Sequence, residues 1–151
     1  MTNPTTIVPL TPLAGDSVVD WALAATPDRV VVAVQGQNGT LWTALSRDGV
    51  RFTPLAQMPL PPGTEGRRPA LCSDGDSVYL AFQTWDLEMS LRAMSMHFYV
   101  NRSLESGWTK VASRPVAIPD LYALELTVCG KKLLAVGTDW TGPIQMVTVE
   151  R

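Results

Sequence analysis

Histidine and cysteine are nearly absent from this chain of 151 residues. It has one histidine, His97, and two cysteines, Cys72 and Cys129, which do not form a Cys-x-x-Cys pair. A histidine-based metal cluster or a Ser-His-Asp triad has too few residues from which to be built, so we expect no metal ligands and no catalytic residues. We expect both cysteines to be small buried side chains, with a disulfide between them as the open alternative.

Charge and long apolar runs are also scarce. Charged residues make up 17% of the chain, below the usual value of about a quarter. The net charge of −2 and the pI near 5.3 argue against nucleic acid or an anionic membrane as a partner. No apolar run approaches the ~18 residues of a membrane-spanning helix. The residues from Met1 to Pro4 show no secretory signal, so we expect a cytoplasmic or non-classically exported protein.

Turn-forming and apolar residues are plentiful. The chain has 46% apolar residues, 11 glycines and 12 prolines. The apolar content is enough for a buried core, and the length suggests a single domain over residues 1–151. Many turn-formers together with few charged helix-formers predict an all-β fold.

An internal repeat organises the chain. Three apolar segments align on an alanine, and these alanines are 48 and 54 residues apart: Val31–Gln35, Tyr79–Gln83 and Leu133–Gly137. Each segment follows a turn and another apolar run, which predicts a hairpin, and a further strand follows each hairpin. The repeats span about 15–59, 60–115 and 116–151.

A fourth strand is clear in only two repeats, at Phe52–Ala56 and Trp108–Ala112. The third repeat stops at Arg151 without one. Leu10–Ala14 matches Phe52–Ala56 at four of five positions. We therefore expect residues 7–14 to supply the outer strand of the last repeat.

Four short antiparallel strands with a period near 50 are typical of a β-propeller blade. The alternative is a β-sandwich or barrel with accidental self-similarity. Three blades cannot close a ring, because propellers typically have about four to eight. We therefore predict a six-bladed ring formed by a head-to-tail homodimer, in which each N-terminal strand completes the other chain's third blade.

The segment Ser46–Phe52 has the pattern Ser-x-Asp-Gly-x-x-Phe. It resembles the Asp-box, or BNR repeat, of sialidase-like and lectin-like β-propellers, in which the last residue is usually Trp. In that family the Ser and Asp side chains hold the turn, and the aromatic ring packs beneath it. The resemblance therefore implies a structural role for this turn. The counterpart at Ser103–Trp108 keeps the glycine and the aromatic residue but has no Asp.

Two loops that follow the second strands, at residues 84–88 and 138–142, pair a tryptophan with a carboxylate. An aromatic face stacks on sugar C–H groups while a carboxylate accepts hydroxyl hydrogen bonds, and nearby arginines add donors. The expected carbohydrate-binding residues are Trp85, Asp86, Asp139, Trp140, Arg92 and Arg68. The alternative is that both tryptophans fill gaps between blades.

Enzyme motifs are missing, since the chain has no P-loop and no Gly-x-Ser-x-Gly elbow. A sialidase resemblance would call for three clustered arginines, a Tyr–Glu pair and an Asp. Residues of these types are present, but no motif connects them: Arg68, Arg92, Arg114, Tyr122 and Glu125. We therefore expect a lectin-like propeller without catalysis or cofactor, whose partners are a glycan and a second copy. A protein-interaction module and a sialidase-like glycosidase are the alternatives.

Overall fold

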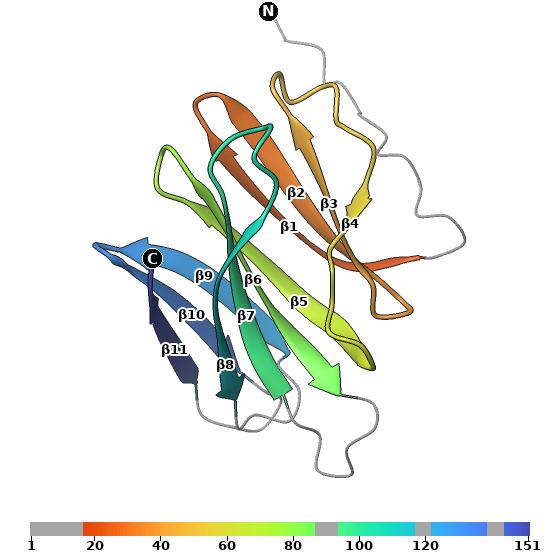
Figure 1. Cartoon of the computed structure of the whole chain (residues 1–151), viewed down its shortest axis with the longest axis vertical. Coiled ribbons are helices and arrows are strands. Elements are labelled where there is room, and N and C mark those ends of the chain that lie inside the picture. Colours follow the sequence, from red (N-terminus) through yellow and green to blue (C-terminus); the bar gives the residue numbers. More distant parts are fainter. Residues whose placement is uncertain (1–16, 87–93, 117–121, 139–143) are drawn as a thin grey trace, which may run out of the picture.

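The computed structural model describes residues 17–86, 94–116, 122–138 and 144–151. These residues form eleven strands and no helix (Figure 1). The strands are β1 (Val18–Thr26), β2 (Arg29–Gly36), β3 (Leu41–Ser46), β4 (Ala56–Gln57), β5 (Thr64–Ser73), β6 (Val78–Asp86), β7 (Met94–Asn101), β8 (Thr109–Val116), β9 (Ala123–Cys129), β10 (Lys132–Thr138) and β11 (Gln145–Glu150). The predicted all-β class is confirmed. The same residues contain no helix that could span a membrane.

The strands form three antiparallel sheets, each built from strands that follow one another in the chain. Sheet 1 has the order β1-β2-β3-β4, sheet 2 the order β5-β6-β7-β8, and sheet 3 the order β9-β10-β11. A fourth strand of sheet 3 was predicted from residues 7–14, which lie outside the described residues.

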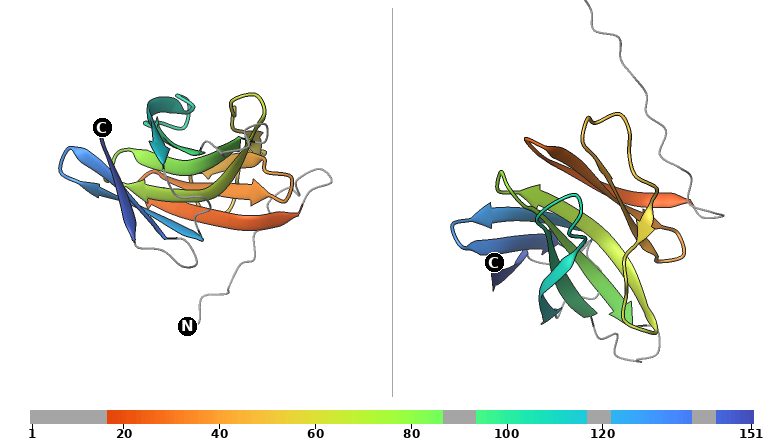
Figure 2. Two further views of the ribbon diagram at one scale, coloured as in Figure 1. Left: turned by 90° about the horizontal axis from the view of Figure 1, so that it is seen from below. Right: turned by 45° about the horizontal axis from the view of Figure 1, so that its top comes forward.

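The three sheets follow one another in space as they do in the sequence (Figure 2). Strand β5 contacts both β1 and β9, so the first strands of the three sheets are neighbours. This is a propeller-like arrangement, because the first strands of successive blades meet near the axis of a propeller. We call the side of a sheet that faces the next sheet its forward face and the opposite side its back face.

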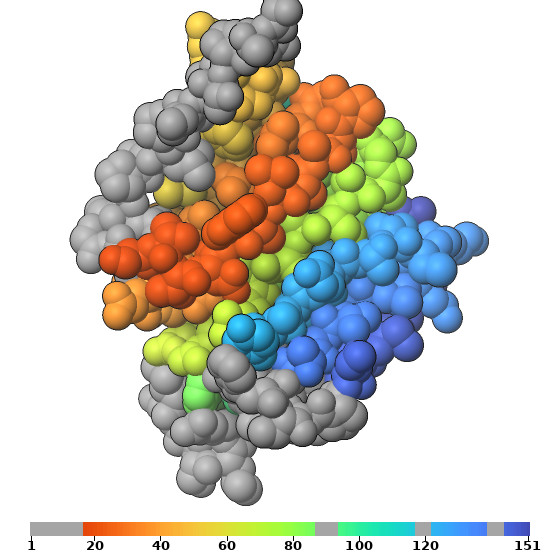
Figure 3. Space-filling view, turned by 180° about the vertical axis from the view of Figure 1, so that it is seen from behind, coloured from red at the N-terminus to blue at the C-terminus, as the bar shows by residue number. Residues whose placement is uncertain are grey.

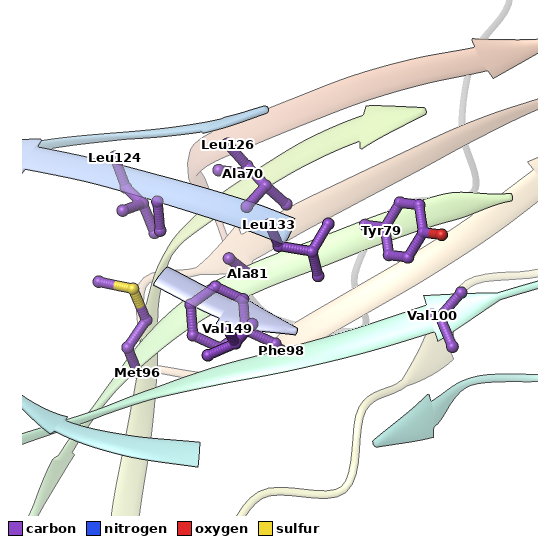
Figure 4. Packing of buried hydrophobic residues seen from close by; sticks show 11 residues of the cluster. Ala70, Tyr79, Ala81, Met96, Phe98, Val100, Leu124, Leu126, Leu133 and Val149 are labelled. Carbon is purple, nitrogen blue, oxygen red and sulfur yellow. The ribbon is translucent and has the colours of Figure 1, made fainter. Parts of the chain in front are cut away.

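Two apolar cores hold the sheets together. The core between sheets 1 and 2 contains Ala33, Leu41, Leu80, Phe82 and Tyr99. The core between sheets 2 and 3 is larger and contains, among others, Ala81, Phe98, Leu126, Leu133, Ala135 and Val149 (Figure 4). Each fully buried large apolar side chain contributes roughly 1.5–3 kcal/mol relative to its exposed state.

The three alanines that align the repeats do not occupy equivalent places. Ala33 packs against sheet 2, and Ala81 packs against sheet 3, so both lie on forward faces. Ala135 instead packs in the same core as Ala81, on the back face of sheet 3. Because successive strand residues point to opposite faces, the sequence alignment is off by one residue in the third repeat.

The hairpin turns give the correct alignment. Thr26 pairs with Arg29, and Cys129 pairs with Lys132, so both hairpins close through two residues. Superposing these turns makes Val136 the equivalent of Ala33. The structural repeat is therefore 48 residues and then 55.

The turn of residues 46–51 has the geometry that the Asp-box resemblance implied. The Ser46 hydroxyl donates to Asp48 Oδ1 over 3.0 Å, and the backbone N–H groups of Val50 and Arg51 donate to the same oxygen over 2.9 and 2.8 Å. The Arg51 and Val50 N–H groups, with the Ser46 hydroxyl, lower the pKa of Asp48 to about 2. Gly49 has φ +71°, which favours glycine.

An aromatic residue, Phe52 or Trp108, follows this turn and its counterpart in sheet 2, and each packs in an apolar core. Phe52 packs on Val32, Val34 and Ala44 at the back face of sheet 1. In sheet 2, Trp108 lies between sheets 1 and 2. Its indole N–H donates to Thr43 Oγ1 over 3.1 Å, which joins the two sheets.

The fourth strand of sheet 1 is shorter than predicted. Phe52 forms only an isolated bridge to Ser46, and β4 is limited to two residues, Ala56 and Gln57. Pro54 has no N–H to donate, so a continuous ladder through the predicted strand is interrupted there.

Candidate functional site

A groove of about 310 Å³ runs along the first strands of the three sheets. In Figure 3, β5 lies between β1 and β9 on this face of the molecule. Each of the three strands contributes four residues to the lining: Asp20, Trp21, Ala22 and Leu23 from β1; Arg68, Pro69, Ala70 and Leu71 from β5; and Tyr122, Ala123, Leu124 and Glu125 from β9 and the residue before it.

A β-bulge places Arg68 in the groove. The register of β5 on β6 shifts between Arg67 and Ala70, and Arg68 has φ +53°, a left-handed conformation that is rare for residues other than glycine. Its backbone N–H donates to Gln35 Oε1 of β2 over 2.9 Å. This contact from sheet 1 helps to hold the strained backbone, and a bulge of this kind redirects the side chain.

A second bulge, in β1, places Asp20. The register of β1 on β2 shifts between Val18 and Asp20. The Asp20 carboxylate accepts a hydrogen bond from the Trp21 backbone N–H over 2.8 Å, and its other oxygen lies 3.4 Å from the Arg68 guanidinium. Both side chains are about 30% exposed, so this pair orients the two groups more than it stabilises the fold.

Strand β9 and the residue before it supply an aromatic ring and a second carboxylate. The Arg68 guanidinium carbon lies 5.9 Å from the centroid of the Tyr122 ring, which is within cation–π range. Tyr122 is 47% exposed, so part of its ring is open to a ligand. Glu125 is exposed, and no described residue gives its carboxylate a hydrogen bond or an ion pair.

The groove therefore combines three kinds of group from three strands. A guanidinium donates hydrogen bonds, carboxylates accept them from hydroxyl groups, and an aromatic ring stacks on C–H surfaces. This combination suits a polyhydroxylated ligand.

The predicted site residues fall into three groups. Arg68 lies in the groove. Trp85 and Asp86 are the last two residues of β6, so the prediction that they lie in a loop is wrong. Trp85 pairs with Glu65 and with Met94, because β6 continues its ladder with both neighbouring strands to this end. Arg92, Asp139 and Trp140 lie outside the described residues.

Trp85 is engaged by the arginine that precedes Arg68. The Arg67 guanidinium lies 4.0 Å from the centroid of the Trp85 ring and also pairs with Glu65 over 2.8 Å. A sugar that stacks on this face of Trp85 has to displace Arg67. The bulge thus separates two adjacent arginines, one toward Trp85 and one toward the groove.

Sequence reasoning missed the convergence of Asp20 with Tyr122 and Glu125. In the sequence, Tyr122 and Glu125 stand out only as residue types that a sialidase-like site would use. A usable signal is present in the pattern, since the first strands carry a charged residue inside an apolar run, as at Asp20 and Glu125. Charged side chains are almost never fully buried without a partner, so such a residue indicates a position that is open to solvent or to a ligand.

His97 belongs to a buried network in sheet 2. Its Nε2 lies 2.8 Å from Thr84 Oγ1, its Nδ1 lies 2.8 Å from Ser113 Oγ, and its ring stacks on Phe82 with centroids 5.3 Å apart. Burial lowers the pKa of His97 to about 4, so the ring is neutral at pH 7. It links three strands of one sheet and does not line the groove.

Both cysteines are free thiols. Burial raises the pKa of Cys72 to about 11, so its thiolate is scarce at neutral pH. Cys129 is exposed, which corrects the expectation that both are buried: it ends β9 beside the turn at Gly130. In the described part of the chain no three His, Cys, Asp or Glu side chains are grouped so as to hold a metal ion.

No protein-family model matches the chain, and no curated protein sequence matches it. Among solved structures the chain resembles an alpha-L-arabinanase of Penicillium chrysogenum complexed with arabinobiose. The sequence identity is 10%, the TM-score is 0.46, and the match covers 89% of this chain and 58% of that chain. The chain therefore spans less than two thirds of the arabinanase. At this TM-score the likeness defines neither the number of blades nor a shared activity.

The expectation that the chain is not an enzyme is corrected here. One solved structure that it resembles is that of an alpha-L-arabinanase, a glycoside hydrolase. The missing P-loop and nucleophile elbow exclude only the chemistries that use those motifs. Glycoside hydrolysis needs two suitably placed carboxyl groups, and these need no short sequence signature.

Proposed function

We propose that this chain forms three blades of a β-propeller and binds carbohydrate in the groove along β1, β5 and β9. One observation carries the proposal: a guanidinium, an aromatic ring and two carboxylates from three separate strands line one groove. The bulges in β1 and β5 support it, because both redirect charged side chains toward the same place.

Each side chain has a distinct role in this proposal. Arg68 donates hydrogen bonds to sugar oxygens, and Tyr122 stacks on the C–H face of a sugar ring. Glu125 accepts hydrogen bonds from hydroxyl groups, because its carboxylate has no partner among the described residues. Asp20 orients Arg68 and accepts a further hydroxyl.

We also propose that the other predicted sugar-binding residues extend this site. Trp85 and Asp86 end β6 beside the beginning of β5, which is the end of the sheet that carries Arg68. In the proposed propeller, Arg92, Asp139 and Trp140 belong to the same end. A longer oligosaccharide reaches from the groove to these residues.

Hydrolysis of the bound sugar is the second candidate. The observation that favours it is the pair of carboxylates, Asp20 and Glu125, on opposite sides of β5 in one groove. Two carboxyl groups that flank a glycosidic bond are sufficient as acid and base or nucleophile.

A glycan array followed by titration calorimetry tests binding. Replacing Tyr122 by Ala removes the stacking ring and is expected to weaken binding by ~1–3 kcal/mol, the size of burying a large apolar side chain. Arg47→Ala is the matched control, because Arg47 is exposed and lies in a distant turn, where it pairs with Glu105. The proposal fails if no glycan binds, or if Tyr122→Ala binds as tightly as the unchanged chain.

Release of reducing sugar from each bound glycan distinguishes binding alone from hydrolysis. If the chain is a hydrolase, Glu125→Gln abolishes product release while the sugar still binds. Binding without release in the unchanged chain rejects the second candidate.

A further inference from the structure

The exposed large apolar side chains of the strands gather at the two ends of the series of sheets. At one end, β1 of sheet 1 exposes Val19, Trp21 and Leu23 by 51%, 66% and 54%. At the other end, sheet 3 exposes Met146 by 62%, with Ile144 beside it at 76%. Such contiguous apolar surface on a soluble domain marks an interaction site.

The back face can be compared through one leucine in each first strand. Leu23 pairs with Val32, Leu71 with Leu80, and Leu126 with Ala135, which are equivalent positions of the repeat. Leu71 packs in the cores between sheets 1 and 2, and Leu126 is only 7% exposed in the core against sheet 2. Leu23 is exposed because no described sheet precedes sheet 1.

The forward faces of the three sheets can be compared in the same way, through one residue in each third strand. Thr43, Phe98 and Met146 are the equivalent residues of the third strands, each paired with the residue of the second strand that points forward. Thr43 is 2% exposed and Phe98 is 0% exposed, because the next sheet covers them. Met146 is 62% exposed, since no described sheet follows sheet 3.

We propose that these two surfaces dock onto a second copy of the chain, with the back face of sheet 1 in one copy packed on the forward face of sheet 3 in the other. The inference rests on the proposed function, in which the three sheets are blades of a β-propeller. It identifies the surfaces through which two chains form a six-bladed ring. Both contacts inside the chain join a forward face to the back face of the next sheet. The two free faces are one of each kind, so a second copy continues the same packing.

A pair of chains covers the back face of sheet 1 and the forward face of sheet 3 in both copies. Each copy offers one free back face and one free forward face, so a two-fold pair forms two identical contacts and leaves neither face open. The resulting six sheets lie within the usual range of about four to eight blades. Phe52 and Leu55 already cover the part of the back face near β3, so the partner meets the part along β1.

The free forward face carries apolar and uncharged polar residues together with three charged ones. Its described members include Leu134, Val136, Thr127 and Thr148. Its charged members are Glu125 of β9, and Lys132 and Glu150, which pair with each other over 3.9 Å at the start of β10. In the pair, β1 of the partner lies next to β9. The partner therefore closes the open side of the groove beside Glu125.

Two substitutions on opposite faces test the contact by light scattering after size-exclusion chromatography. The unchanged chain runs as two chains per particle. Leu23→Lys and Met146→Asp each place a charge in both contacts of the pair and weaken association by roughly 100-fold, because an unpaired charge is buried in apolar surface. Each variant alone therefore runs as a monomer at micromolar concentration.

Mixing the two variants gives the sharpest outcome. A pair of one Leu23→Lys chain and one Met146→Asp chain has one unchanged contact and one that joins Lys to Asp, so a two-chain particle returns. Val50→Asp is the matched control, because Val50 is 48% exposed in a turn outside both faces, and it leaves the pair intact. Circular dichroism spectra of all variants report whether they remain folded.

A folded monomer for the unchanged chain overturns the proposal, and so does a mixture of folded variants that stays monomeric. Glycan binding is measured on the unchanged chain, because Leu23 itself lines the groove. A two-chain particle that binds no glycan contradicts the proposed function and leaves the contact standing, whereas a glycan-binding monomer does the reverse.

Discussion

Arg68 is the residue on which the groove depends most. Its left-handed backbone, its N–H bond to Gln35 and its guanidinium contacts with Asp20 and Tyr122 all belong to one bulge. Arg68 is predictable from the sequence as a hydrogen-bond donor, whereas the bulge is not. A residue before proline favours an extended conformation, so Pro69 gives no sign of the left-handed backbone at Arg68.

Replacing Arg68 by Gly and by Ala separates strain from binding. Both variants lose the guanidinium, so both are expected to bind glycan more weakly. Glycine adopts φ +53° without strain, so Arg68→Gly is expected to be more stable than Arg68→Ala by about 1 kcal/mol. Urea unfolding curves of the two variants measure this difference. Equal stability would show that the backbone is not strained at this position.

His97 gives the stability of the chain a predictable pH dependence. Burial holds its folded pKa at about 4, below the ordinary value of 6.5, so the unfolded chain takes up a proton first as the pH falls. The stabilisation is complete above about pH 6.5 and is lost between there and about pH 4. It amounts to roughly 1–3 kcal/mol.

Urea unfolding at pH 7 and pH 4.5 measures this loss. Carboxylates also titrate in this range, so the His97→Gln variant is the control: it keeps hydrogen-bonding groups but cannot take up a proton. The difference in the free energy of unfolding between the unchanged chain and His97→Gln should become smaller as the pH falls. A difference that is the same at both pH values contradicts the role assigned to His97.

At the scale of elements, hairpins were well predicted and registers were not. The turns between the first two strands of each sheet contain Pro27, Gly75 and Gly130, and all three fall where expected. The register slip at Ala135 arose because Leu-Leu-Ala-Val reads equally well on either face. Only packing decides which face is buried, and packing is not visible in a single sequence.

The same limit explains the error at Trp85. A tryptophan next to an aspartate after an apolar run suggests a loop, yet β5 and β7 both continue to pair with β6 through Trp85. Strand ends depend on the length of neighbouring strands, which lie far away in the sequence. The groove was missed for this reason too, since β1, β5 and β9 meet only in space.

The turn at Asp48 predicts a second pH effect, at the scale of one element. Three hydrogen bonds to its carboxylate lower its pKa to about 2, below the ordinary value of 3.8. The stabilisation is therefore present above about pH 4 and is lost as the pH falls to about 2. Asp48→Asn should lower the melting temperature at pH 7 but have little effect at pH 2. Thermal melts at both pH values check this, and an equal effect at both would contradict it.

At the scale of the whole molecule, the described residues form three sheets in sequence, with exposed apolar side chains on the back face of sheet 1 and on the forward face of sheet 3. The all-β class and the three repeats followed from the sequence, because turn residues and alternation recur at a regular spacing. The free faces could not be read from it. A leucine on a back face looks the same in the sequence whether or not a neighbouring sheet covers it, as Leu23 and Leu126 show.

The N-terminal strand gives a prediction at this scale. If residues 7–14 complete the partner's third sheet, deleting residues 1–14 leaves the edge of β11 without its outer neighbour. The intact chain should then run as two chains by light scattering, and the truncated chain as a monomer or an aggregate. A truncated chain that still forms a folded pair would show that strand exchange is not needed for assembly.

The most direct test of the proposed function is a crystal structure of the chain with a glycan selected on an array. The account predicts that a sugar ring lies in the groove between β1 and β9, stacked on Tyr122, with its hydroxyl groups bound to Arg68 and Glu125. A sugar bound elsewhere while the groove is empty would contradict it. Crystals that contain no sugar, although the same glycan binds in solution, would contradict it as well.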